Sequence, residues 1–480
     1  MKRFWFVAVR PLLVLTIVAG LAHAQAAAPA VAPAASDLSK VLADRVDLYQ
    51  KSVGIVVGTL DSTGNTKLYT YGQSGTPGVA LNGDTVFEIG SMTKVFTSLI
   101  LADMVRRGEV SLDDPIAKYL PATVKVPERN GRKITLIDLA THSSGLPRMP
   151  SNFHPADPKN PYADYSVDQM YEFISGYTLT RDIGAQYEYS NLGAGLLGHA
   201  LARRAGTDYE TLVKTRILQP LKMTSTSITL SPEQQRRLAH GHNETLQPWS
   251  NWDLPTLAGA GALRSTVNDV LKFLAAEVAA NTGSPQTDLA KSMKAQLEPR
   301  RPAGGNLPPG STMDIALAWH ILTREGDPMV WHNGGTGGYH SFMGFSPKTK
   351  AAVVVLSNAT NSIDDIGRHL LDARYDYAKL TVPKEHKEIT LDAKLLDAYV
   401  GQYQLAPGAI MTIARAGDGL TAQITGQGAN PIFPESETDF FLKVVDAQLT
   451  FQKNTEGKVS GLVLHQAGRD LPGKKMDSGQ

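Results

Sequence analysis

The sequence contains no cysteine among its 480 residues. Disulfide frameworks, thiolate metal sites, cysteine nucleophiles and lipid anchoring through an N-terminal cysteine are therefore excluded. An excess of either charge is also missing, because 47 Lys and Arg residues stand against 46 Asp and Glu residues. This balance gives no electrostatic footprint for nucleic acid or for an anionic membrane. With 42% hydrophobic residues the chain can bury a substantial core, and its length predicts one large or two to three ordinary domains.

Long apolar runs are scarce, and the most conspicuous one lies near the N-terminus. A basic start (Lys2 and Arg3) is followed by an apolar run over residues 11–22 and then by small residues. This order is typical of a secretory signal peptide, which we expect to cover residues 1–24. The run of about a dozen residues is shorter than the roughly 20 that span a bilayer. We therefore expect a secreted or periplasmic protein with no stable membrane span after cleavage, although a retained anchor stays open.

The region from 37 to 382 mixes strand and helix patterns, after an Ala/Pro-rich stretch at 25–36 that predicts a flexible leader. Helical spacing of apolar residues, ended by Gly108, predicts a helix around 95–105. A second apolar helical run covers 193–205. Alternating apolar segments bounded by turn residues predict strands at both ends of the region, at 53–58, 67–71, 329–331, 341–345 and 351–356. These segments favour an α+β fold, in which one antiparallel sheet is assembled from distant parts of the chain and flanked by helices.

The texture of the sequence changes after a short charged linker at 383–390. Residues 391–480 carry short strand-like runs at regular intervals, separated by turn residues, at 399–403, 411–414, 420–425, 440–445, 448–451 and 459–464. Such spacing is typical of a small all-β barrel or sandwich. This segment has no evident pairing of a nucleophile with a base. We expect it to serve in binding, capping or dimerisation.

Ser91 and Lys94 lie three residues apart at the start of the predicted helix, on one helical face. A serine hydroxyl is a weak nucleophile and needs a neighbouring base. A lysine in a water-poor site can supply that base, because desolvation disfavours the ammonium form. The helix N-terminus also offers backbone N–H groups to a developing oxyanion. Taken alone, the pair is better explained by an N-cap serine and a solvated lysine.

Two further motifs carry suitable groups. Tyr189 and Asn191 stand in Tyr-Ser-Asn, where a phenol beside a cationic lysine would ionise more easily and an amide could hold an amide substrate. His332 begins His-Asn-Gly-Gly, in which Gly334 and Gly335 would let a substrate approach the strand backbone closely. Alone, the first motif could be a tyrosine that caps the core, and the second a glycine-rich hairpin.

The three motifs together, in this order, resemble the serine β-lactamase and penicillin-binding protein superfamily. The likeness is strongest to class C β-lactamases and to class C low-molecular-mass penicillin-binding proteins, which include D-alanyl-D-alanine carboxypeptidases and related esterases. Further similar stretches lie at 135–147 and 258–266. The resemblance covers about residues 40–380. It implies a β-lactamase/transpeptidase-like fold with a helical insertion, and the C-terminal segment is separately similar to a lipocalin-like β domain.

The resemblance assigns a role to each residue of the first two motifs. Ser91 would be the acylated nucleophile, with Lys94 and Tyr189 as the proton-transfer pair. Asn191 would hold the amide of the substrate.

In the third motif, His332-Asn333-Gly334 stands where the family has Lys-Thr-Gly. The resemblance therefore implies that His332 and Gly334 bind the substrate. The backbone N–H groups of Ser91 and Gly335 would form the oxyanion hole. His332 replaces a permanent cation by a group that titrates near neutrality. Substrates that bear a carboxylate should therefore bind more weakly as the pH rises through the pKa of His332, and efficient β-lactam hydrolysis is in doubt. His142 falls in a signature loop and is expected to be structural.

The sequence therefore predicts a serine hydrolase that acts through an acyl-serine intermediate. The sequence leaves its small-molecule or peptide substrate open. The substrate can be a β-lactam, a D-Ala-D-Ala peptide such as a peptidoglycan stem peptide, or a related amide or ester. A non-hydrolytic penicillin-binding sensor or scaffold and a carboxylesterase unrelated to the cell wall are the alternatives. No metal or organic cofactor is expected, because H-E-x-x-H and G-x-x-x-x-G-K-[ST] are absent. The sequence does not fix the oligomeric state.

Overall fold

The computed structural model describes residues 35–298, 301–305, 307–406, 408–466 and 469–476. The predicted signal peptide and all but the last two residues of the predicted leader lie outside these ranges. Among the described helices, none combines the length and the apolar character that a bilayer span would need. The region before the charged linker is called the body below, and the segment after it is called the barrel.

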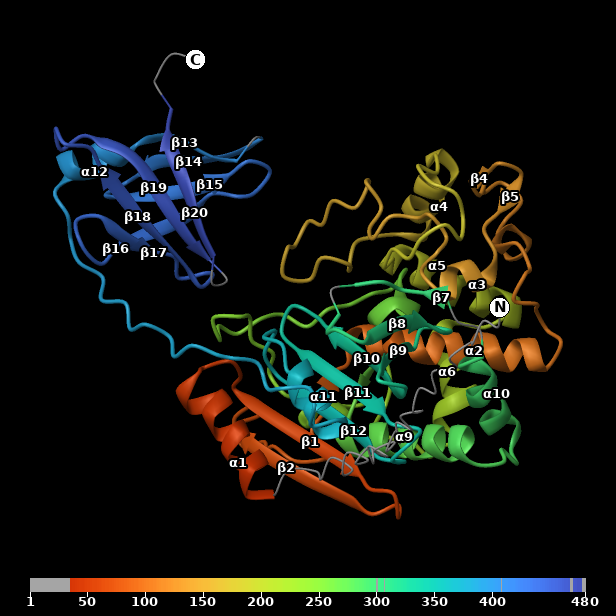
Figure 1. Ribbon diagram of the computed structural model, residues 1–480. Coiled ribbons are helices and arrows are strands. Elements are labelled where there is room, and N and C mark those ends of the chain that lie inside the picture. Colours follow the sequence, from red (N-terminus) through yellow and green to blue (C-terminus); the bar gives the residue numbers. More distant parts are fainter. Residues whose placement is uncertain (1–34, 299–300, 306, 407, 467–468, 477–480) are drawn as a thin grey trace, which may run out of the picture. The chain divides into compact units, whose positions relative to one another are not determined.

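The body is built on one antiparallel sheet of eight strands within the described residues (Figure 1). Its order joins the two ends of the body, because the N-terminal strand β1 pairs with the late strand β12. Across the sheet the strands are β2 (Thr66–Gly72), β1 (Gly54–Leu60), β12 (Ala352–Ser357), β11 (His340–Phe345), β10 (Asp327–Gly335), β9 (His320–Arg324), β8 (Ser311–Ile315) and β7 (Arg301–Pro302). Two short pairs lie outside it: β3 (Phe87–Glu88) with β6 (Arg264–Ser265), and β4 (Glu128–Arg129) with β5 (Arg132–Lys133).

Helices cover both faces of this sheet. The α-helices of the body are α1 (Ala35–Ala43), α2 (Thr93–Arg106), α3 (Leu136–Ala140), α4 (Val167–Gly176), α5 (Asn191–Ala205), α6 (Tyr209–Val213), α7 (Pro232–Arg236), α8 (Ala258–Gly261), α9 (Val267–Thr282), α10 (Asp288–Gln296) and α11 (Asp364–Leu371). Short turns of other helix types are η1 (Asp44–Leu48), η2 (Gly90–Met92), η3 (Ile116–Tyr119) and η4 (Lys214–Leu218).

The alternation of side chains along the strands divides the core of the body into two layers. In β1, Val56 joins the large core that includes α2, α5 and α9. Its neighbours Ile55 and Val57 join a second core with Leu38 of α1 and Ile366 of α11. Because both faces of the strand are covered, the strand is apolar at consecutive positions rather than at every second one.

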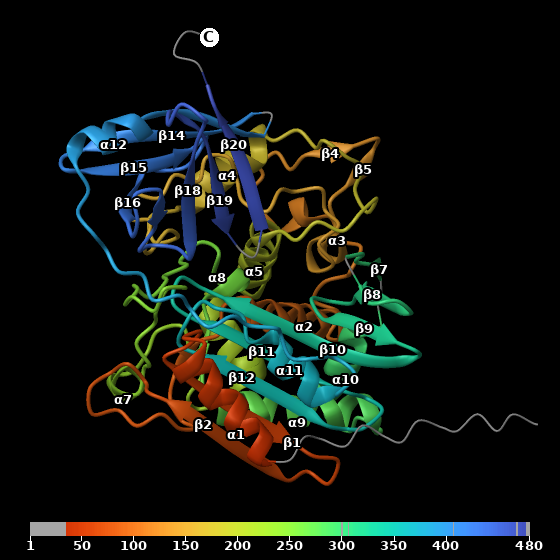
Figure 2. The ribbon, with the colours of Figure 1, turned by 60° about the vertical axis from the view of Figure 1, so that its left-hand side comes forward.

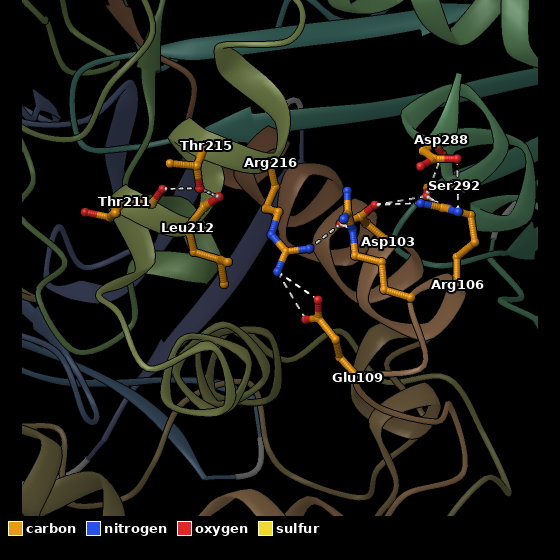
Figure 3. Close-up of polar contacts among 10 residues, drawn as sticks. Asp103, Arg106, Glu109, Thr211, Leu212, Thr215, Arg216, Asp288 and Ser292 are labelled. Atoms are coloured by element: carbon orange, nitrogen blue, oxygen red, sulfur yellow. Dashed lines mark hydrogen bonds and ion pairs between the residues drawn. The ribbon is translucent and has the colours of Figure 1, made fainter. Parts of the chain in front are cut away.

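A buried ion network fixes the C-terminal end of α2 to its surroundings. Figure 3 shows Asp103 of α2 between Arg216 of η4 and Arg106. The Asp103 carboxylate accepts hydrogen bonds from Arg216 Nη1 at 2.9 Å and from Arg107 Nε at 2.7 Å. Arg216 also donates to Glu109, at 2.9 and 3.2 Å. The network thus anchors the C-terminal end of the helix that follows Ser91.

The C-terminal segment folds into a closed eight-stranded antiparallel barrel within the described residues (Figure 2). It is preceded by the helix α12 (Ala393–Tyr399). The strands are β13 (Gly401–Ala406), β14 (Ala409–Ala416), β15 (Gly419–Ile424), β16 (Asn430–Pro434), β17 (Asp439–Phe441), β18 (Ala447–Lys453), β19 (Val459–Gln466) and β20 (Arg469–Lys475). Pairing of Tyr403 with Lys475 closes the ring. Closure leaves no free strand edge in the described barrel.

The predicted fold class is confirmed: an α+β body with a flanked antiparallel sheet, and an all-β barrel after it. The predicted helix at 95–105 is α2, and Gly108 follows it with a φ of +70°. One expected strand start is wrong, because Tyr399 ends α12 instead of beginning a strand. The strands β16 and β20 are absent from the sequence expectation.

Candidate active site

Ser91 lies in the short 3₁₀ turn η2, directly before α2, and its side chain is partly exposed. The residue before it must be glycine for two reasons. Gly90 has a φ of +48°, and a Cβ atom there would lie 2.9 Å from both the backbone N and O of Gly335. The turn can therefore approach β10 only because Gly90 has no side chain.

Lys94 is buried and holds the centre of the site. Its Nζ lies 2.9 Å from Ser91 Oγ, 2.9 Å from Asn191 Oδ1 and 2.7 Å from the carbonyl oxygen of Ala260. Burial, assisted by the charge of Arg148, lowers the pKa of Lys94 well below its usual value. A neutral amine has two N–H groups, and the two oxygens of Asn191 and Ala260 can only accept. The nitrogen lone pair is then left for the hydroxyl proton of Ser91, which is the arrangement of a general base.

Tyr189 lies against Lys94 and is partly buried. Its ring stacks on His142 with centroids 4.5 Å apart, and Lys94 Nζ lies 4.8 Å from the ring centroid. Burial raises the pKa of Tyr189, outweighing a hydrogen bond to Ser91 and the charge of Arg148. This direction is the reverse of the sequence expectation that the phenol ionises more easily, because burial of the phenol opposes its ionisation. Tyr189 is therefore a neutral phenol that can donate a proton.

Asn191 is the first residue of α5, and local capping fixes its position. Ser190, the N-cap, accepts from Gly193 N at 2.8 Å and donates to the Pro147 carbonyl at 2.6 Å. Asn191 Oδ1 accepts from Lys94, while its Nδ2 lies 3.3 Å from the Tyr162 hydroxyl. The amide is thus oriented by groups on both sides, with its weaker contact toward Tyr162.

The register of β10 and β11 directs the Gly335 N–H away from the sheet. Thr336 N donates to Tyr339 O at 3.0 Å, so these two residues form a hydrogen-bonded pair. In an antiparallel ladder such pairs alternate, so Gly335 opposite His340 is a pair without hydrogen bonds. The Gly335 N–H therefore points away from β11, and Gly335 lies beside η2, because a Cβ atom on Gly90 would be 2.9 Å from Gly335 N. The oxyanion hole formed by the N–H groups of Ser91 and Gly335 stays a prediction.

Gly334 serves packing within the protein. A Cβ atom at this position would lie 2.1 Å from the carbonyl oxygen of Ile89, 2.5 Å from Ser341 Oγ and 2.9 Å from Ser91 N. Ser341 Oγ in turn donates to Ile89 O at 2.9 Å. The glycine lets β10 lie directly on the turn that carries Ser91, and its role toward a substrate stays a prediction.

His332 is fully buried. Its Nδ1 lies 2.6 Å from the carbonyl oxygen of Asn333, and its Nε2 has no hydrogen-bond partner among the described residues. Burial, together with the neighbouring His320 and Lys94, lowers the pKa of His332 well below 6.5. The expected charge that titrates near neutrality is therefore not found here. His332 is neutral at neutral pH, and its part in substrate binding stays a prediction.

Three of the predicted residues, Ser91, Asn191 and Gly335, line one small pocket of the described structure. A pocket above Ser91 is lined by Gly90, Ser91, Tyr162, Asn191, Trp252, Leu254, Ala260, Gly261, Gly335 and Thr336. Lys94 and Tyr189 contact Ser91 from below this lining, and the His332 ring lies 6.4 Å from the Tyr189 ring between centroids. His142, expected to be structural, accepts from Ser190 N at 3.1 Å and stacks on Tyr189.

Comparison with known proteins agrees with this geometry. The family described as beta-lactamase matches residues 42–378, well over half of the chain. The chain belongs to the β-lactamase family. Residues 385–476 match a second family, described as a domain of unknown function, DUF3471. Membership makes the body a serine hydrolase, as the sequence predicted.

Curated relatives and solved structures place the chain within the family. It is 31% identical to the D-alanyl-D-alanine-carboxypeptidase/endopeptidase AmpH of Escherichia coli K12, over 72% of this chain and 93% of that protein. It is 26% identical to penicillin-binding protein 4* of Bacillus subtilis, over 81% and 87%. The fold is similar to a β-lactamase/D-alanine carboxypeptidase from Yersinia pestis, with a TM-score of 0.59 and 23% identity over 71% of this chain and 99% of that one.

Sequence reasoning missed several residues of this β-lactamase-family site. Ala260, whose carbonyl accepts from Lys94, lies inside the stretch 258–266 that carried part of the resemblance. Tyr162 and Trp252 line the pocket but stand in no recognisable motif. Arg148 directly follows the stretch 135–147, and its guanidinium carbon lies 5.2 Å from the centroid of the Tyr189 ring. Its closeness in sequence to that stretch was the available signal.

Proposed function

We propose that this protein cleaves D-Ala-D-Ala peptides and related amide or ester bonds through an acyl-Ser91 intermediate. The observation that carries the proposal is the buried Lys94 amine, 2.9 Å from Ser91 Oγ, whose two N–H groups are taken up by other oxygens. A neutral amine in this position is a base for the serine hydroxyl without help from a carboxylate.

In the proposed acylation, Ser91 Oγ attacks the substrate carbonyl carbon while its proton passes to Lys94. The carbonyl oxygen takes on negative charge and is stabilised by the N–H groups of Ser91 and Gly335. The carbon–nitrogen bond then breaks, and Tyr189 gives its proton to the leaving nitrogen while it receives one from Lys94. A water molecule later attacks the ester, gives one proton to the Lys94–Tyr189 pair, and releases the acid as Ser91 regains its hydroxyl.

We propose a peptide substrate ahead of a β-lactam. The relative with 31% identity is a carboxypeptidase/endopeptidase by name, whereas the β-lactamase of Escherichia coli K12 is 27% identical over 57% of this chain. The neutral His332 also removes the cation that we associate with efficient β-lactamases. β-Lactams are therefore expected to acylate Ser91 and to be released slowly.

Parallel turnover of nitrocefin, a D-Ala-D-Ala peptide and a short p-nitrophenyl ester by the wild type and by Ser91→Ala tests the proposal. We expect the peptide and the ester to be cleaved, nitrocefin to be cleaved slowly, and all three activities to be lost in Ser91→Ala with little change in stability. Activity retained in that variant would refute the mechanism. Intact mass spectrometry after penicillin exposure adds a second measure, since an adduct that is never released would instead indicate a sensor.

The location and domain limits belong to the same proposal. The order of basic, apolar and small residues over 1–24 supports export and cleavage. We place the hydrolase body at 37–382, the linker at 383–390 and the barrel at 391–480. Mass measurement of the protein recovered from the cell exterior or periplasm checks the cleavage, because a product that begins at Gln25 is expected.

A further inference from the structure

The His-Asn-Gly-Gly motif of β10 supplies no accessible positive charge that could bind a substrate carboxylate. Lys94 is buried and its amine is occupied by protein oxygens. His332 has no exposed surface. Neither residue can therefore meet a substrate carboxylate as a charged, accessible partner.

Arg148 is an exposed cation beside the reacting groups. Its guanidinium carbon lies 5.2 Å from the centroid of the Tyr189 ring. Its position is fixed through the backbone, because its carbonyl oxygen accepts from Asn191 N at 3.0 Å and from Leu192 N at 3.3 Å. The loop that carries Arg148 is thus bound to the start of α5, where Asn191 is also held. The side chain itself remains exposed to solvent.

No carboxylate pairs with Arg148 in the part of the chain that the structure describes. The nearby acid Glu188 is engaged by Arg181, and the buried Asp138 is engaged by Arg132 at 3.0 Å and Arg301 at 2.8 Å. The guanidinium group of Arg148 is therefore available to a ligand. Arginine is suited to this use, because its planar guanidinium binds a carboxylate with two parallel hydrogen bonds.

We propose that Arg148 is a specificity-determining residue that binds a carboxylate of the substrate beside Tyr189. The inference rests on the proposed acyl transfer at Ser91, because Tyr189 then faces the leaving nitrogen and a substrate must lie along its ring. The carboxylate can come from two sources in a peptide: the free C-terminus of the leaving residue, or an acidic side chain on the acyl side of the scissile bond.

Two pairs of probes separate these sources. The first pair is an N-acetylated D-Ala-D-Ala tripeptide with a free C-terminus and its C-terminal amide. The second pair has glutamate or glutamine as the residue before D-Ala-D-Ala. Each pair is measured as a ratio of kcat/KM in the wild type, Arg148→Gln and Arg148→Lys. Arg236→Gln, which removes an exposed arginine of α7, is the matched control.

For one pair, we expect the ratio of kcat/KM for the carboxylate-bearing probe to kcat/KM for the neutral probe to fall roughly 10- to 100-fold in Arg148→Gln. The fall should come mainly from a higher KM for the carboxylate-bearing probe. The ratio in Arg148→Lys should lie between those of the wild type and Arg148→Gln, because lysine keeps the positive charge but cannot form two parallel hydrogen bonds to a carboxylate. The pair that responds locates the carboxylate. If Arg148 only held the loop, both members of each pair would lose activity equally. Unchanged ratios in both pairs therefore overturn the proposal.

The failure of this inference differs from the failure of the proposed function. If Ser91→Ala still cleaved the p-nitrophenyl ester, the acyl-serine mechanism would be lost whatever Arg148 did. If ester cleavage required Ser91 but both ratios stayed constant in Arg148→Gln, only the carboxylate assignment would fall. Acylation by benzylpenicillin and by its neutral methyl ester, followed by intact mass, supplies the same ratio independently of peptide turnover.

Discussion

The hydrolase body and the barrel both bury a core, but they treat polar side chains differently. The body buries an amine (Lys94) and four imidazoles (His142, His242, His320 and His332), and among the described residues none of them is hydrogen-bonded to a carboxylate. In the described barrel, the core consists of apolar and tyrosine side chains, and a buried hydroxyl such as that of Tyr403 donates to a backbone carbonyl. A folded chain tolerates buried, unneutralised groups where function requires them. The difference therefore marks the body as the seat of the chemistry.

The largest effect should follow from removing the buried amine. Lys94→Met is expected to lower kcat by roughly 10²- to 10⁴-fold, because the general base is lost. The difference in the free energy of unfolding between Lys94→Met and the wild type should also change with pH. Folding lowers the pKa of Lys94, so the unfolded state binds the extra proton and the wild type gains stability as the pH rises toward 10.5. The variant lacks this term and should lose its relative stability by about 1.4 kcal/mol per pH unit across that window.

Urea unfolding of both proteins between pH 7 and 10 measures this difference. Ser91→Ala is the matched control, because it is inactive but keeps the buried lysine and hence the pH-dependent term. A constant stability gap between Lys94→Met and the wild type would mean that Lys94 is not a buried neutral amine.

Acid should destabilise the body before the barrel. Burial lowers the pKa of His320 to about 4 and those of His142 and His332 well below 6.5. The unfolded state therefore binds more protons below pH 6.5, and stability falls as the pH decreases from there. Three such groups give a slope of up to about 4 kcal/mol per pH unit.

Thermal unfolding followed by calorimetry between pH 7 and 5 separates the two regions. In the barrel, His465 lies 2.7 Å from Asp470 and has exposed surface. We expect the transition of the body to move strongly to lower temperature and that of the barrel to move less. Equal shifts of both transitions would contradict the contrast.

The core of the barrel should be separable from catalysis. Phe451 is buried, and its ring stacks on Tyr399 with centroids 4.2 Å apart. Phe451→Ala should destabilise the barrel by about 3–5 kcal/mol and leave ester hydrolysis unchanged. Phe96→Ala is the matched variant in the body, since Phe96 is buried on α2 and stacks on Phe273 at 4.4 Å. It should cost similar stability but also lower kcat, because α2 carries Lys94.

The fold could be predicted from the sequence where local patterns decide it. The hairpin of β1 and β2 follows from two strand-like runs on either side of a turn, and the end of α2 follows from Gly108. The strands β16 and β20 could not be predicted, because Pro431 and Pro472 lie inside them and are unfavourable in strands. Only closure of the ring, a long-range interaction, places these segments in the barrel.

The site shows the same division. Motifs predicted which residues meet, and Ser91, Lys94 and Tyr189 lie together in the structure. Their charge states could not be predicted, because burial comes from packing of distant segments. The expected titration of His332 near neutrality and the expected easier ionisation of Tyr189 both differ from the structure for this reason. Whether these residues carry the assigned roles is for the experiments to decide.

The smallest expected effects come from two buried polar groups, a hydroxyl group in the barrel that has a hydrogen-bond partner and a carboxyl group in the body with one oxygen that has none. Tyr403 donates its hydroxyl to the Tyr399 carbonyl at 2.7 Å, so Tyr403→Phe should cost the barrel about 1 kcal/mol. In the body, Glu277 Oε1 has no partner among the described residues, and burial raises the pKa of Glu277 well above its usual value. Folding thus holds a proton that the unfolded state releases, which costs stability as the pH rises from about 4.5. Glu277→Gln removes this cost, so it should raise the Tm of the body at pH 7 and have no such effect near pH 4. A loss of Tm at pH 7 would show that the hydrogen bond from Asn281 Nδ2 to Glu277 Oε2, at 3.1 Å, offsets the burial of the carboxyl group.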